Sequence, residues 1–130
     1  MKGQVSLEFL LLIGVFFSCL LIILPIINFS VGQIMNTNDI LLAKQISQII
    51  ETEDDLFSFI GNDSSKEFEF IPTKKITLKT TGNSFEVFTD QKSFAIELND
   101  KQETKETEFT TKFFVSITKE NDKTKISFFS

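Results

Sequence analysis

The sequence predicts an α+β protein in which one long N-terminal helix packs against a small antiparallel β-sheet. Three observations predict this class. Residues 9–27 form an almost unbroken apolar run, residues 31–60 carry apolar side chains at helical spacing, and the remainder alternates apolar and polar residues as strands do. The 130 residues suffice for one folded domain and one membrane anchor.

The run from Phe9 to Ile27 is long enough to cross a membrane as a helix. Its nineteen residues rise about 28 Å, against a hydrocarbon core of about 30 Å. Lys2 precedes the run and no charge follows it before Asp39. This bias predicts a cytoplasmic N-terminus and an extracellular remainder.

Four residues inside the run have special properties. Gly14 and Ser18 lie four apart on one helix face, a spacing that lets helices approach closely, although both residues are also tolerated on a lipid-facing surface. Pro25 lacks a backbone donor, so a kink or local loosening is expected there. Cys19 is interpreted as a small buried hydrophobe.

After Asn28 the pattern becomes amphipathic and predicts that the helix continues to about residue 59. Gly61-Asn62 is the predicted C-terminal stop. One stripe of apolar residues, spaced mostly by three or four, is expected to face a core: Val31, Ile34, Met35, Leu41, Leu42, Ile46, Ile49, Ile50, Leu56, Phe57 and Ile60.

The rest of the chain alternates with period two and predicts an antiparallel meander with one buried face, which the helix stripe covers. The predicted strands are 66–71, 74–80, 84–89, 92–98, 108–118 and 124–129. The predicted connections are Pro72-Thr73, Thr81-Gly82-Asn83, Asp90-Gln91, a charged loop at 99–107, and Glu120-Asn121-Asp122. The predicted inward residues are Phe68, Phe70, Ile76, Leu78, Phe85, Val87, Phe94, Ile96, Leu98, Phe109, Phe113, Val115, Ile117, Ile126 and Phe128, whereas Phe88, Phe114 and Phe129 face outward.

A short polar leader, Met1-Lys2-Gly3, precedes a motif at the start of the apolar run. Gln4, Ser6, Glu8 and Leu12 fit the pattern Q-x-S-x-E-x-x-x-L, and with it the chain resembles an archaeal type IV pilin with a class III signal peptide. The resemblance covers about a dozen residues and the general layout of a long helix and a small β domain. It implies a type IV pilin-like fold, and a prepilin peptidase that recognises the motif and cuts between Gly3 and Gln4. The resulting segments are a leader at 1–3, a transmembrane or filament-core helix at 4–27, an amphipathic helix half at 28–60 and an extracellular β domain at 61–130.

Glu8 is a carboxylate at the edge of an otherwise uncharged helix, which marks a functional position. It lies one helical turn from Gln4, whose amino group would be freed by cleavage and would be a natural counter-ion in the same or a neighbouring subunit. The resemblance implies pairing between subunits during assembly. The alternative is that Glu8 lies at the headgroup level and favours the helix dipole, a contribution of at most about 1 kcal/mol.

Composition excludes several functional classes. The chain has no His, one Cys and a net charge of −5, so we expect no metal, no cofactor and no nucleic-acid partner. No catalytic motif is present, and we expect no enzyme. Two sequons make Asn28 and, in a loop, Asn62 candidate glycosylation sites.

The sequence therefore predicts a structural subunit, major or minor, of an archaeal surface filament, with adhesion as a candidate role. Its expected partners are the prepilin peptidase, identical or related pilin subunits, the assembly machinery and, before assembly, the membrane. One alternative is a single-pass membrane protein whose extracellular β domain binds a ligand or partner without polymerising. Another is an archaellin-like motility subunit, although the motif spacing resembles the pilin group better.

Overall fold

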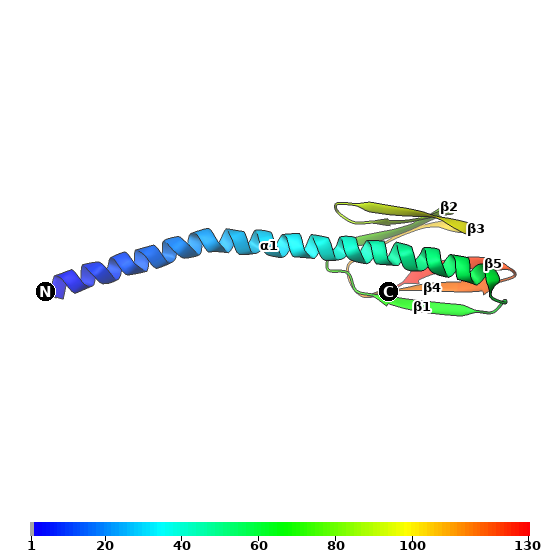
Figure 1. Cartoon of the computed structure of the whole chain (residues 1–130), viewed down its shortest axis with the longest axis horizontal. Helices are drawn as coiled ribbons and strands as arrows, with labels where there is room; N and C mark the ends of the chain where they lie inside the picture. Colours follow the sequence, from blue (N-terminus) through cyan, green and yellow to red (C-terminus); the bar gives the residue numbers. More distant parts are fainter. Residues whose placement is uncertain (1) are drawn as a thin grey trace. The chain divides into compact units, whose positions relative to one another are not determined.

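The computed structural model describes residues 2–130, which form one helix and five strands (Figure 1). Helix α1 runs from Lys2 to Phe59. The strands are β1 Ser65–Phe70, β2 Ile76–Phe88, β3 Ser93–Phe109, β4 Phe113–Glu120 and β5 Lys123–Phe129. The predicted α+β class is confirmed, with a long apolar N-terminal helix and small antiparallel sheets packed against it. The chain divides between Ile34 and Met35 into two compact units.

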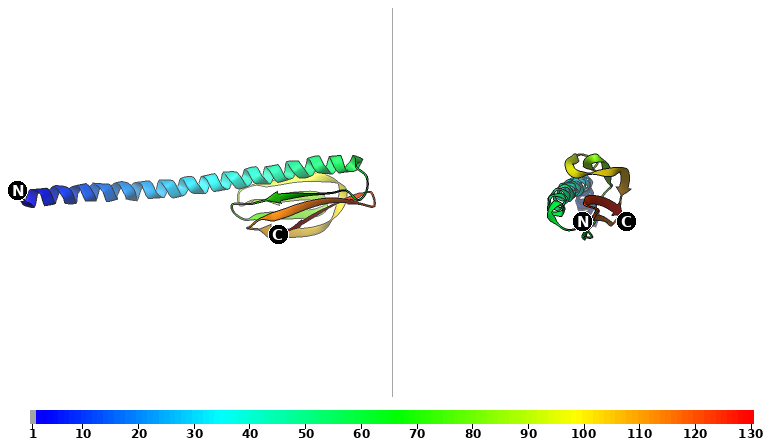
Figure 2. Two further views of the ribbon diagram at one scale, coloured as in Figure 1. Left: turned by 90° about the horizontal axis from the view of Figure 1, so that it is seen from below. Right: turned by 90° about the vertical axis from the view of Figure 1, so that its right-hand side faces the viewer.

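The strands of residues 35–130 form two sheets, so the predicted single meander is wrong. One sheet has the order β1-β4-β5 and the other is the β2–β3 hairpin, and every pair is antiparallel. The part of α1 in this unit lies along one side of the strands (Figure 2). The chain leaves β1 through a connection in which the Thr73 amide donates to Asp39 Oδ1 of α1 at 2.8 Å. The next strand, β2, pairs with β3 in a separate hairpin, and β1 pairs with β4.

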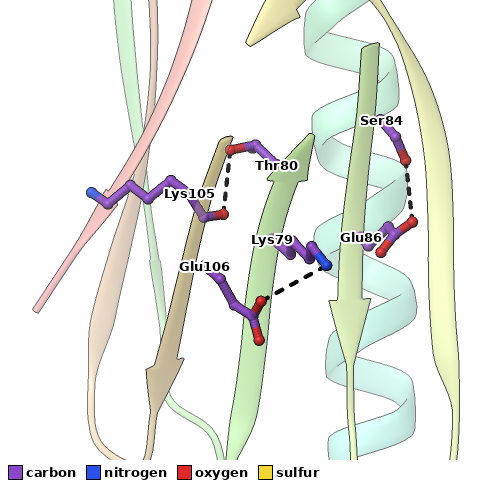
Figure 3. A network of polar contacts seen from close by, with 6 residues as sticks. All are labelled: Lys79, Thr80, Ser84, Glu86, Lys105 and Glu106. Carbon is purple, nitrogen blue, oxygen red and sulfur yellow. Dashed lines mark hydrogen bonds and ion pairs between the residues drawn. The ribbon is translucent and has the colours of Figure 1, made fainter. Parts of the chain in front are cut away.

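Two predicted interruptions are absent from the β2–β3 hairpin. The expected turn at Gly82 lies inside β2, where glycine takes a left-handed φ of 58° at a shift in strand register. The expected charged loop at 99–107 lies inside β3. Most of its charged side chains are exposed, and one of them, Glu106, pairs across the hairpin, with Oε2 3.8 Å from Lys79 Nζ (Figure 3). The break expected at the loop instead occurs at 110–112, inside the predicted strand 108–118.

A wide bulge in β3 separates the two ends of the hairpin. Between the Thr80–Lys105 pair and the Ser84–Glu97 pair, β3 advances eight residues while β2 advances four. Thr80 holds the bulged strand through its hydroxyl, which donates to Glu103 O at 2.7 Å. The bulge turns polar side chains of β3 away from β2 and toward the neighbouring elements.

The predicted turns at 90–91 and 120–122 are found. In the second, Asn121 and Asp122 have φ values of 52° and 61°, the left-handed pair expected of a two-residue type I′ hairpin turn. Asn and Asp tolerate this conformation better than other non-glycine residues.

One apolar core joins both sheets to the helix. Of the predicted inward residues, Phe68, Phe94 and Ile96 are partly buried against this core and the others are buried within it. The outward expectation also holds for Phe129, which is 45% exposed and stacks on the half-buried Phe114 with ring centroids 5.6 Å apart. The alternation of strand residues thus predicted the core correctly.

The buried face of the helix differs from the predicted stripe. Several expected core residues are exposed, namely Val31, Ile34, Met35, Leu41, Leu56 and Ile60. The buried face consists of Ala43, Ile46, Ile50 and Phe57 with four polar residues, Asp39, Ser47, Glu53 and Asp54. Each of these polar side chains has a partner: Asp39 and Asp54 accept from backbone amides of a connection and a strand, Glu53 pairs with Lys66, and Ser47 donates to Ala43 O.

Lys119 of β4 donates hydrogen bonds to backbone carbonyls at the C-terminal end of α1. Its Nζ is buried and donates to Phe57 O and Ile60 O, each at 2.7 Å, and to Ser58 O at 3.3 Å. The final carbonyls of a helix lack partners within the helix, and a cation there also favours the helix dipole. Gly61 was expected to end the helix, but Gly82 is the only described glycine with a positive φ, and Asp63 takes the left-handed conformation instead.

We predict that Lys119→Met destabilises the folded chain by about 2 kcal/mol, because buried helix carbonyls lose a charged donor. The measurement is urea unfolding of the full chain in a nonionic detergent, followed by the circular dichroism of the strands. Lys123→Met, an exposed position in the same hairpin, is the control and should leave the midpoint nearly unchanged. Equal midpoints for the two variants would show that the hydrogen bonds of Lys119 to the end of α1 contribute little to the stability of the fold.

Candidate assembly surface

The apolar side chains of residues 2–34 are exposed along α1. From Val5 to Ile34, the large apolar residues that face outward are each at least 46% exposed. The most apolar stretch of 18 residues in the helix has a mean hydropathy of 3.0, and none of its residues is buried by the rest of the described chain. A contiguous apolar surface of this extent requires lipid or other protein. The helix is long and apolar enough to anchor the chain in a membrane.

Gly14 and Ser18 lie in a shallow groove on this surface. The groove has a volume of about 630 Å³ and is lined by Leu7, Leu10, Leu11, Gly14, Val15, Ser18, Cys19 and Ile22. The Ser18 hydroxyl donates to Gly14 O at 2.8 Å, so its proton is used within the helix. A Cβ added at Gly14 would meet nothing within 4 Å. Packing within the chain therefore gives no reason for a glycine there. Cys19, which the sequence analysis interpreted as a buried residue, is an exposed free thiol in this chain.

Helix α1 continues through Pro25. Proline donates no amide hydrogen, so Leu21 O receives none from the residue four positions later. One turn further on, the Ser30 hydroxyl donates to Ile26 O at 2.8 Å.

The motif residues lie in the first turns of α1. Gln4, Ser6, Glu8 and Leu12 are all exposed, and Gly3 has open space around it. Met1, the first leader residue, lies outside the described residues. Among residues 3–130, no side chain forms an ion pair or hydrogen bond with Glu8. The carboxylate and Gln4 are one helical turn apart, as the sequence spacing requires.

The two candidate glycosylation sites differ in their surroundings. Asn28 is exposed on α1 among apolar neighbours. Asn62 is exposed in the connection between α1 and β1, where its Oδ1 accepts from the Asp122 amide at 2.8 Å. That contact uses the oxygen of the exposed Asn62 side chain and not its nitrogen, the atom that carries a glycan.

The sequence interpretation missed the three buried carboxylates of α1, two of which, Asp39 and Asp54, bind backbone amides. Asp39 accepts from the Thr73 amide, and Asp54 Oδ2 accepts from the Asn99 amide at the β3 bulge, each at 2.8 Å. The second oxygen of each carboxyl is buried and has no hydrogen-bond partner. Burial raises the pKa of Asp54 above its ordinary value of 3.8; the Asn99 amide opposes this effect, and the charges of Asp100 and Asp55 reinforce it.

These carboxylates bind backbone amides and so have a structural role. A signal for them was present, since residues 39, 43, 46, 50, 54 and 57 continue one helical stripe when polar residues are counted. Within residues 2–130, no group of three His, Cys, Asp or Glu side chains is arranged to hold a metal ion.

No known family model, curated protein or solved structure matches this chain.

We compare the free energy of unfolding of the unaltered chain with that of Asp54→Asn. We predict that the unaltered chain loses stability relative to the variant as pH rises. The folded pKa of Asp54 lies above its unfolded value, so its contribution is most favourable below about pH 3.8 and is lost as pH rises through the folded pKa. Asparagine keeps an oxygen for the Asn99 amide but does not titrate. The measurement is urea unfolding of both proteins between pH 3.5 and 7. Asp90→Asn, at an exposed turn, controls for net charge, and a stability difference that rises with pH would contradict the assignment.

Proposed function

We propose that this chain is a structural subunit, major or minor, of an archaeal type IV pilus-like surface filament. The observation that carries the proposal is the apolar surface of residues 5–34, which no part of the described chain covers. Residues 35–130 have their own core, so this surface is not needed for their folding. A helix of this kind can lie in lipid, and it can also pack against other helices through small residues at close approach.

Processing would convert the membrane protein into an assembly-competent subunit. In the proposed sequence of events, a prepilin peptidase recognises the motif and cuts between Gly3 and Gln4. The new α-amine of Gln4 lies at the start of the helix, one turn from Glu8. A charge left unpaired in an apolar bundle costs several kcal/mol, so neighbouring subunits are held at the stagger that pairs an amine with a carboxylate.

The apolar surface would serve twice. Before assembly it holds the subunit in the membrane, with the N-terminus in the cytoplasm and the strands outside. During assembly the helices leave the lipid and form the filament core, and the open groove at Gly14 allows close approach of a second helix. One repeated head-to-tail contact that does not close into a ring gives an open helical filament.

A membrane-anchored binding domain that never polymerises is the competing function. It is supported by the self-contained core of residues 35–130. The two functions differ in the state of the N-terminus, because sheared surface filaments composed of a chain that begins at Gln4 would support the pilin assignment.

We predict that Glu8→Ala yields cleaved, folded, membrane-bound subunit but few or no filaments. Alanine makes the segment more apolar, and residue 8 is outside the unit of residues 35–130 that contains the core, so insertion and folding should be normal while the neighbouring amine loses its partner. Glu8→Asp, shorter by one methylene, should retain partial assembly. The measurement compares cleavage, membrane content and sheared filaments in one experiment.

The control for processing is Gly3→Phe, which should remain uncleaved in the membrane with Glu8 intact. A normal filament yield from Glu8→Ala would favour the headgroup and dipole role of this carboxylate. An intact Met1 terminus in surface filaments of the unaltered chain would reject cleavage.

A further inference from the structure

A polar groove lies between β3 and β5, entirely within residues 35–130. Its volume is about 540 Å³, within the range of about 300–1,000 Å³ typical of ligand sites. Six charged residues line it, namely Lys101, Lys105, Lys123, Lys125, Glu103 and Glu120. Four lysines against two glutamates make the groove positive in a chain whose net charge is −5.

The groove is fixed by hydrogen bonds between the two sheets. The buried Gln102 side chain of β3 donates to Thr124 O at 2.8 Å and accepts from the Ile126 amide at 2.9 Å. Asp100 Oδ2 accepts from the Thr124 amide at 2.7 Å. These contacts satisfy backbone groups on the outer edge of β5. They also hold the walls of the groove at a constant separation.

None of the four lysines of the groove forms an ion pair with an acidic side chain of the described chain. The four ion pairs in the described chain engage Lys66, Lys75, Lys79 and Lys112, all outside the groove. Lys105 extends from β3 away from β2 (Figure 3), and its Nζ donates to Phe128 O of β5 at 3.2 Å. Clustered ammonium groups without counter-ions attract an anionic ligand.

The distribution of the charges favours an extended ligand over a compact one. Lys101 and Lys105 lie on β3, along one wall, and Lys123 and Lys125 lie on β5, along the other, so the positive charges are distributed over both sides of the groove. Glu103 lies between the two lysines of β3 and can accept hydrogen bonds only from a ligand that also carries donors.

We propose that this groove binds an acidic polysaccharide, a chain of sugars with carboxylate or sulfate groups at intervals. The anionic groups contact the four lysines, and sugar hydroxyls donate to Glu103 and Glu120. An acidic segment of a second copy fits less well, because its carboxylates supply no such donors. The proposal rests on the proposed function only for the location of these strands outside the cell.

The test uses the full chain in a nonionic detergent, with labelled polygalacturonate and dextran sulfate as carboxylate and sulfate probes. Neutral dextran tests the need for charge, and polyphosphate tests the need for hydroxyls. The groove variant is Lys101→Gln/Lys123→Gln/Lys125→Gln. The matched control, Lys44→Gln/Lys75→Gln/Lys92→Gln, has the same net charge with substitutions outside the groove.

We expect one or both acidic polysaccharides to bind, and the groove variant to weaken that binding about tenfold or more, since three ammonium groups that contact the ligand are lost. The control variant should lose less than about twofold, and circular dichroism should show both variants folded. Equal losses in the two variants, no binding of either polysaccharide, or equal binding of polyphosphate would overturn the proposal. Self-association abolished by the groove variant alone would assign the groove to a second copy. Because the assay needs no filament, its outcome is independent of the Glu8 experiment.

Discussion

Both sheets of this protein depend on one face of the same helix. A two-stranded hairpin is at best marginally stable alone, and the β2–β3 hairpin shares no strand with the other sheet. Ala43, Ile46, Ile50 and Phe57 of α1 belong to the core that joins the sheets. The polar contacts on that face, from Asp39 to Thr73 and from Asp54 to Asn99, fix where each loop or strand meets the helix. Apolar burial supplies the attraction, and these contacts supply the alignment.

Periodicity predicted the parts of this fold that depend on local sequence. The helix ends at Phe59, as its pattern indicated, and alternation identified Phe85, Phe113 and Phe128 as core residues. The charged stretch of β3 was misread because charge normally accompanies loops, whereas here most of the charged side chains are exposed on a strand and Glu106 pairs with Lys79 of β2. Strand pairing itself was not predictable, since β1 pairs with β4 and not with the strand that follows it in the sequence, and no local pattern records that choice.

The candidate assembly surface and the polysaccharide groove differ in how far sequence reveals them. A membrane helix is specified by composition over about twenty residues, so Phe9 to Ile27 was recognisable without any tertiary information. The groove exists only because β3 bulges opposite Gly82 and directs Asp100 and Gln102 toward β5. Its four lysines come from two strands that are hydrogen-bonded in different sheets. No linear pattern contains that arrangement.

The contacts on α1 also have a mechanical consequence. Asp39, Asp54 and the carbonyl of Phe57 spread along about 27 Å of helix at 1.5 Å per residue, and each holds a different strand or connection. A pull along the helix axis therefore loads these attachments in shear and at the same time, rather than opening them one after another. Simultaneous rupture requires more force than sequential opening. Residues 35–130 are thus arranged to resist tension applied along the helix much better than a peeling force applied across it.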